Sequence, residues 1–240
     1  IVPMKPLADS MTRIADVISV PRRKALALSM LDQVIRSALD STFYINNKEE
    51  KLSCIVFGGD EFIKAVAIKR GARWEQDAVP GLNPILSFAM KRAFNEGFDA
   101  VLILPGDLPM IRAENIQEII SASAGMSQPV GVQAVKDGGT NALLVPSNWA
   151  IEPSYGVKSF LRHKAKFEAK GTAIKSMDLK DVQFDLDTIE DLKWAIDNIR
   201  NLKAQIDFWM AQIEGPPDLS LIHISEPTRR YAISYAVFCL

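Results

Sequence analysis

Short apolar runs that stop at glycine, proline or aspartate alternate with helical segments along most of this chain. The clearest run, "AVLILPGDLP" at 100–109, is apolar until Pro105, which is typical of a strand that is covered on both faces. Strands that alternate with helices in this way favour a mostly parallel sheet. We therefore predict an α/β fold with a mostly parallel central sheet and helices on both faces.

The expected elements are placed by hydrophobic periodicity and by end signals such as glycine and proline. Strands are expected at 1–4, 53–58, 72–74, 100–109, 129–135, 141–146, 172–177 and 182–186. Helices are expected at 21–39, 60–70, 83–97, 113–123, 156–171 and 188–213. Thr188 and Asp191 have the spacing of a capping box, which supports a helix that begins at 188.

Composition narrows the class of protein. The chain has 240 residues, of which 48% are hydrophobic and 24% charged, as in soluble globular proteins. The net charge of −1 gives no field that would attract nucleic acid or an anionic membrane, and no apolar run reaches the roughly 18 residues of a membrane span. Cys54 and Cys239 lie far apart, and Cys54 is expected to be a buried thiol, which suits the cytoplasm. Whether the chain forms a homo-oligomer stays open.

Both ends of the chain differ from the middle. "IVPM" at 1–4 resembles the middle of a strand, so the first strand is expected to lack its opening residues. Composition changes after Glu214, where "GPPD" ends the preceding helix. Residues 215–240 have no helix or strand period and resemble translated adapter sequence. We therefore expect one domain over 1–214 and an artefactual tail outside it; the alternative is that the tail is a genuine peripheral extension.

Three carboxylates follow expected strands. Ligands of open α/β sheets bind at the carboxyl ends of strands, where Asp107, Asp185 and Asp187 could hold Mg²⁺. In an extended strand, Asp185 and Asp187 would share a face and repel unless a cation lay between them. Alternatively, Asp107 caps a turn, Asp187 caps the next helix and Asp185 is solvated. Three carboxylates at two strand ends favour the metal site.

Two glycine-containing segments could bind an anion. "DGGTN" at 137–141 could turn backbone N–H groups inward, with the Thr140 hydroxyl as a further donor. "YGVKSF" at 155–160 opens a helix, and the free amides near Ser159 suit a phosphate. The alternatives are an ordinary hairpin turn at 137–141 and ordinary helix capping at 155–160.

Basic residues occur at two further places. Lys5 and Arg13 flank the loop after the first strand, where α/β nucleotide binders hold phosphates. No glycine fingerprint is present there, so the cationic side chains would have to do the work of glycine amides. Lys158, Arg162 and His163 can be explained as a solvated basic face of their helix.

Together these motifs resemble the 2-phospho-L-lactate and phosphoenolpyruvate guanylyltransferase family, which has relatives that use 3-phosphoglycerate. The resemblance covers roughly residues 1–200 and rests on "VPMKPL…TRIA", "PGLNPIL", "LPGDLPM", "GGTNALLV", "YGVKSFLRH" and "DLDTIEDL", in that order. It implies a single-domain nucleotidyltransferase fold of the GT-A-like, Rossmann-related type. It also implies transfer of GMP from GTP to the phosphate of a small carboxylic acid, with Mg²⁺, in the biosynthesis of the deazaflavin coenzyme F-420.

The resemblance also implies roles for residues. Asp107, Asp185 and Asp187 are implied as catalytic metal ligands. The phosphate of the acceptor is implied to contact Gly139, Thr140, Gly156 and Ser159, and GTP to contact Lys5, Arg13, Gly81, Leu82 and Asn83. Two positions depart from the pattern: Met11 stands where the family often has lysine, and Gly106 where it often has alanine.

Two other functions compete with this one. A different nucleotidyltransferase of the same fold, such as the molybdenum-cofactor type, usually carries a glycine-rich first loop, which this chain lacks. A catalytically dead nucleotide-binding paralogue would explain Met11, but the three retained carboxylates argue against it. The sequence does not choose among the three acceptors, because they all present one phosphate and one carboxylate.

Overall fold

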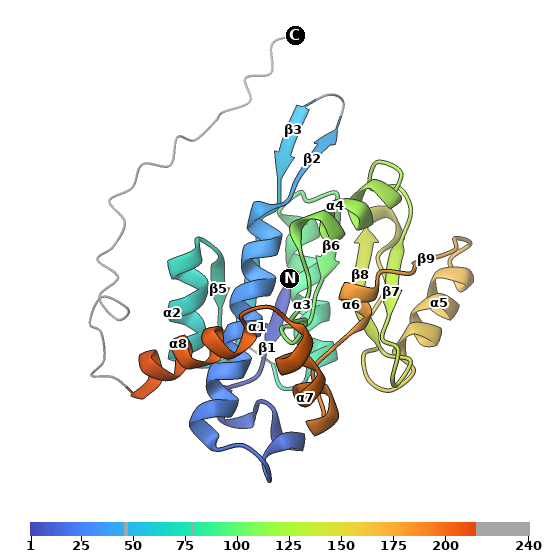
Figure 1. Cartoon of the computed structure of the whole chain (residues 1–240). Coiled ribbons are helices and arrows are strands. Elements are labelled where there is room, and N and C mark those ends of the chain that lie inside the picture. Colours follow the sequence, from blue (N-terminus) through green and yellow to red (C-terminus); the bar gives the residue numbers. More distant parts are fainter. Residues whose placement is uncertain (46–47, 78, 215–240) are drawn as a thin grey trace, which may run out of the picture.

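The computed structural model describes residues 1–45, 48–77 and 79–214, and Figure 1 shows a sheet with helices on both of its faces. One group of strands is parallel and has the order β1 (Val2–Met4), β4 (Ile55–Gly58), β5 (Arg73–Glu75). A second group has the order β6 (Ala100–Ile103), β8 (Thr140–Pro146), β7 (Val130–Gln133), β9 (Lys175–Met177).

Ile1 joins the two groups of strands. Its amino group donates a hydrogen bond to the carbonyl of Leu102 (2.7 Å), and its carbonyl accepts one from the N–H of Leu104 (3.0 Å). In a pair of parallel strands, one residue forms hydrogen bonds with two residues of the neighbouring strand that are separated by a single residue, as Ile1 does here. The strands therefore follow each other as β5, β4, β1, β6, β8, β7, β9.

The direction of β8 decides which residues meet at one edge of the sheet. β8 is antiparallel to both β6 and β7, with Ile103 opposite Leu143, whereas β7 and β9 are parallel. The beginning of β8 at Thr140 therefore lies at the same edge as the ends of β6, β7 and β9. The α/β prediction is confirmed, and the parallel arrangement holds on the β5 side while the other side is mixed.

Apolar clusters of side chains cover both faces of the sheet. The helices are α1 (Val20–Asp40), α2 (Glu61–Arg70), α3 (Leu82–Asn95), α4 (Ala113–Ala122), α5 (Ser159–Ala169), α6 (Lys180–Gln183), α7 (Ile189–Asn198) and α8 (Leu202–Glu214). Val101 and Ile103 belong to the same apolar cluster as residues of α3 and α5, whereas Leu104 belongs to the cluster that contains residues of α1, α2, α4, α7 and α8. This alternation confirms that helices cover both faces.

Two of the expected elements were wrong, and a two-stranded hairpin was missed. Residues 182–186 form no strand, because α6 ends at Gln183 and an irregular segment follows. The expected closing helix is two helices, since Ile199 is extended and Asn201 has a left-handed φ of 65°. A hairpin of β2 (Thr42–Ile45) and β3 (Lys48–Lys51) was not expected.

The expected capping box and the expected burial of Cys54 are confirmed. Thr188 and Asp191 form the capping box of α7 in both directions, and Cys54 is buried, which raises the pKa of its thiol. Among the described residues, no helix is long and apolar enough to cross a membrane. The expected tail at 215–240, with Cys239, lies outside the described residues.

Candidate active site

Asp107 lies in the loop after β6, with one carboxylate oxygen enclosed. Its Oδ1 is buried and has no hydrogen-bond partner among the described residues. Burial and the negative charge of Asp185 raise the pKa of Asp107 to about 6, against opposing effects of a backbone hydrogen bond and of Lys5. Lys5 and Asp185 thus both act electrostatically on Asp107. A proton or a bound cation would neutralise this buried negative charge and so remove its unfavourable free energy.

Backbone contacts hold the Asp185 segment beside this loop. The N–H of Leu186 donates to the carbonyl of Asp107 (3.2 Å). Asn141, at the beginning of β8, donates from Nδ2 to the carbonyl of Val182 (3.0 Å) and, at 3.5 Å, to Oδ1 of Asp185. Asp185 therefore comes close to Asp107 without the strand that the sequence predicted, and the argument that Asp185 and Asp187 share a strand face does not hold.

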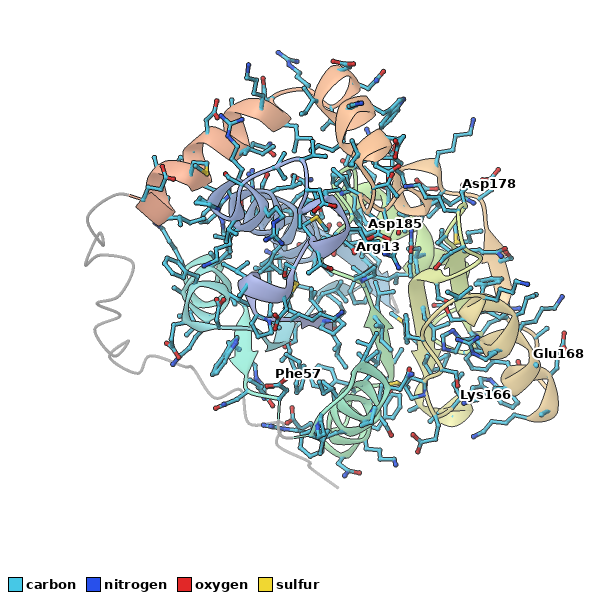
Figure 2. The ribbon with its side chains drawn as sticks, turned by 90° about the horizontal axis from the view of Figure 1, so that it is seen from below. Arg13, Phe57, Lys166, Glu168, Asp178 and Asp185 are labelled. Carbon is cyan, nitrogen blue, oxygen red and sulfur yellow. The ribbon has the colours of Figure 1, made fainter. Side chains whose placement is uncertain are left out.

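Asp187 faces a different partner. It forms an ion pair with Arg13, which comes from a short 3-10 helix at Thr12–Ile14, and Figure 2 shows Arg13 beside the Asp185 segment. The described part of the chain contains no group of three or more His, Cys, Asp or Glu side chains arranged to hold a metal ion. The three predicted ligands are thus divided: Asp107 lies near Asp185, and Asp187 pairs with Arg13. The alternative in which Asp187 caps α7 is also wrong, since Thr188 is the cap.

Lys136 is a residue of this site that the sequence did not reveal. Its ammonium pairs with the carboxylate of Asp191 and lies 3.4 Å from the carbonyl of Asp185. Asp191 in turn accepts from the N–H groups of Asp187 (3.1 Å) and Thr188 (2.8 Å). A single lysine in a loop carries no pattern, so only the structure shows that it fixes this segment.

The two predicted anion-binding segments meet at the start of α5. The N–H of Phe160 donates to the carbonyl of Gly138 (3.2 Å), and Thr140 Oγ1 lies 2.9 Å from Ser159 Oγ. The N–H of Gly139 is already bonded to Oδ1 of Asp137 (2.7 Å), so this amide stabilises the turn between β7 and β8. The segment is therefore a hairpin turn that also delivers the Thr140 hydroxyl to α5.

Gly81 is the N-cap of α3, which begins with Leu82 and Asn83, and Gly81 has a positive φ of 96°. The side chain of Asn83 accepts from the N–H of Tyr155 (2.6 Å) and donates to its carbonyl (3.3 Å). The expected nucleotide segment is therefore tied directly to the expected acceptor segment. The amide of Asn83 serves this connection in the structure, whereas Leu82 is 41% exposed.

Comparison with known proteins assigns the family. The family model described as "Guanylyl transferase CofC like" matches residues 1–198. The chain belongs to this guanylyltransferase family. A phosphoenolpyruvate guanylyltransferase of Sphaerobacter thermophilus is 30% identical over 193 residues, which cover 80% of this chain and 89% of the relative. A 2-phospho-L-lactate guanylyltransferase of Methanocaldococcus vulcanius is 34% identical over 194 residues, which cover 80% of this chain and 81% of the relative.

A solved structure supports the fold. A protein of Desulfovibrio desulfuricans described as a nucleotide-diphospho-sugar transferase superimposes with a TM-score of 0.68, covering 88% of this chain and 95% of the other. At 15% identity this likeness concerns the fold alone. Family and fold together confirm the prediction of a single-domain α/β nucleotidyltransferase and of a guanylyltransferase enzyme.

Gly106, which precedes Asp107, gives a first prediction. A Cβ at this position would lie 2.2 Å from Sδ of Met4, so Gly106→Ala should lower the free energy of unfolding by about 1–3 kcal/mol. Met4→Ala should remove most of this cost, because the clash involves only the Met4 side chain. Urea unfolding of the two single variants and the double variant measures this coupling. Strictly additive effects would contradict the predicted contact.

His163 gives a prediction about pH. Burial, assisted by the charges of Lys166 and Arg162, lowers the pKa of His163 to about 4. Because an unfolded histidine titrates near 6.5, the unfolded chain binds more protons between about 4 and 6.5. The free energy of unfolding should therefore fall by up to about 3 kcal/mol as the pH drops through this window.

Asp107 titrates in the same window with the opposite sign. Its pKa is raised in the folded state, so ionisation of Asp107 costs stability as the pH rises through about 6. The His163 contribution should therefore be measured in an Asp107→Asn background, by urea unfolding between pH 4 and 7. A flat profile in that background, unchanged by His163→Asn, would refute the predicted pH dependence.

Proposed function

We propose that this chain transfers GMP from GTP to the phosphate of phosphoenolpyruvate, 2-phospho-L-lactate or 3-phosphoglycerate, with release of pyrophosphate, in the biosynthesis of coenzyme F-420. The observation that carries the proposal is the enclosed Oδ1 of Asp107, which has no partner within the described part of the chain and lies near Asp185 at the sheet edge that also presents Thr140. A carboxylate that can bind a cation and hydroxyl groups that can donate hydrogen bonds, both at one edge of the sheet, suit two substrates that each carry phosphate. The names of the relatives support the choice of acceptors.

The carboxylates fit a divalent cation such as Mg²⁺. Asp107 and Asp185 are oxygen donors in one electrostatic environment, and Mg²⁺ typically takes one or two carboxylates together with substrate phosphates. Asp187 would join them when Arg13 leaves it for the triphosphate. The bound cation would neutralise charge on the phosphate oxygens.

The chain's own groups would position the substrates. A phosphate dianion is already a nucleophile, so its attack on the α-phosphorus of GTP requires no general base, and catalysis comes from orientation and charge. Lys5 and Arg13 would neutralise the triphosphate. The Gly81–Asn83 segment would border the guanine and ribose. Its hydrogen bond to Tyr155 would hold the GTP-binding segment in a fixed position relative to the acceptor-binding segment.

The acceptor phosphate would lie at the start of α5. The hydroxyls of Thr140 and Ser159 lie 2.9 Å apart there, the backbone of Gly139 and Gly156 would border the phosphate, and a helix start favours an anion. Gly156 has a φ of 124°, a conformation that favours glycine and leaves no side chain over the site.

Pyrophosphate release from GTP and Mg²⁺ tests the proposal, with each of the three acceptors in a separate reaction. The full chain should release pyrophosphate with at least one acceptor and not with GTP alone or with CTP. Folded protein that binds GTP but releases no pyrophosphate with any acceptor would overturn the proposal and favour a nucleotide-binding paralogue.

A further inference from the structure

Three polar side chains form a linear series of hydrogen bonds at the proposed acceptor site. Oγ1 of Thr140 lies 2.9 Å from Oγ of Ser159 and 3.0 Å from Nδ1 of His163. The other ring nitrogen, Nε2, accepts from the backbone N–H of Ser154 (3.0 Å). All three side chains are buried, and His163 is fully enclosed rather than part of a solvated basic face.

The bond from Ser154 determines which nitrogen of His163 carries the proton. A backbone N–H can only donate, so Nε2 must be unprotonated. The ring is neutral near pH 7, because burial and nearby cationic side chains lower its pKa to about 4. Its single proton must therefore be on Nδ1, and Nδ1–H donates to Oγ1 of Thr140.

This tautomer fixes how many donors remain for a ligand. Thr140 and Ser159 together carry two hydroxyl protons, and one of them makes the bond between the two oxygens. Because the ring donates to Thr140, the second proton stays free. If the ring accepted instead, Thr140 would donate to the ring and Ser159 to Thr140, and neither proton would remain.

We propose that His163 is a positioning residue that commits the Thr140–Ser159 pair to donating one O–H to the phosphate of the acceptor. This inference rests on the proposed function, in which that pair contacts the phosphate. A fully ionised phosphate only accepts hydrogen bonds, so a site that presents a donor at this point binds it, and a site in which both protons are already engaged does not.

Side chains other than His163 also hold the surrounding loop, so the proposed positioning role of His163 can be tested separately from a structural role. Nε and Nη2 of Arg162 donate to the carbonyl of Ser154 (3.1 and 2.9 Å), and Asn83 bonds to both backbone groups of Tyr155. Loss of the His163 ring therefore leaves the loop attached at neighbouring positions.

Two substitutions of similar size give opposite expectations. The amide in His163→Asn can still donate to Thr140, so the KM for the acceptor should stay within about threefold of the wild type. The carboxylate in His163→Asp can only accept while ionised, so this KM should rise about 10- to 100-fold. The KM for GTP should stay within about twofold in both variants, because the GTP groups lie elsewhere. Equal acceptor KM values for the two variants, measured at a pH above the pKa of the introduced aspartate, would overturn the inference.

The ring tautomer provides a readout that does not depend on turnover. Nitrogen NMR of the full chain distinguishes Nδ1–H from Nε2–H, and the chain has only two histidines. The second, His223, lies outside the described residues, and the His223→Asn variant assigns its signal. We expect Nδ1–H for His163; the Nε2–H tautomer would overturn the inference even if His163→Asp failed to fold. Absence of turnover in the wild type would instead count against the proposed function.

Discussion

Asp107→Asn should lower kcat/KM for GMP transfer by roughly 10²–10⁴-fold while the protein stays folded. The amide keeps the shape of the side chain but loses the negative charge that would hold the cation. The enclosed Oδ1 has no protein partner among the described residues, so no bond within the fold is lost with it. Wild-type turnover in this variant would refute the role of Asp107 as a metal ligand.

Stability gives a second measure of the same substitution. A rise of the Asp107 pKa from 3.8 to about 6 corresponds to about 3 kcal/mol against the ionised form. Without divalent cation at pH 7, Asp107→Asn should therefore melt at or above the temperature of the wild type. Mg²⁺ should raise the melting temperature of the wild type and of the exposed control Asp197→Asn, and should leave that of Asp107→Asn unchanged.

Gly58→Ala should lower the free energy of unfolding by about 2–5 kcal/mol. Gly58 ends β4 with a φ of 79°, and a Cβ there would lie 2.6 Å from the carbonyl oxygen of Met4. That oxygen belongs to the backbone of β1, so it cannot move away without separating β1 from β4. Lys5 follows Met4 directly, so activity should fall together with stability.

Gly71 provides the matched control. Its φ is 89°, and an added Cβ would have no atom within 4 Å, so Gly71→Ala carries only the conformational cost of about 1–2 kcal/mol. Urea unfolding of both variants measures the difference, which isolates the clash with β1. Equal losses in the two variants would show that the contact between Gly58 and Met4 has no energetic consequence.

The sequence predicted the elements that bury a periodic face and missed those that do not. Helix α1 shows its pattern in Leu28, Leu31 and Ile35, which are fully buried. Strand β3 consists of Lys48–Lys51, all charged, so the hairpin gave no apolar alternation to detect. Apolar and polar residues alternate over 182–186 as in a strand, but Val182 lies in the single-turn helix α6 and is buried there.

The residues of the candidate site likewise fall into those that the sequence predicted and those that it missed. Carboxylates and glycines at strand ends were visible because their types and positions form motifs, and Asp107, Thr140 and Ser159 do come to one edge of the sheet. The groups that orient them were not visible. His163 lies among Arg162 and Lys164, so local sequence favoured exposure, and only the packing of α5 shows its burial. Asn83 bonds to a residue 72 positions away, which no local pattern encodes.

The reversed strand β8 has a consequence for protein engineering. Because β8 returns along β7 and the chain then leads into α5, the phosphate-binding groups proposed for the acceptor all come from the single stretch 130–163. The groups proposed for GTP come from residues before 84. A chimera that takes only this stretch from a relative would therefore carry the complete set of proposed phosphate-binding groups and leave the nucleotide half intact. Because all three acceptors present a phosphate, such a chimera should keep turnover with the acceptor of the parent chain.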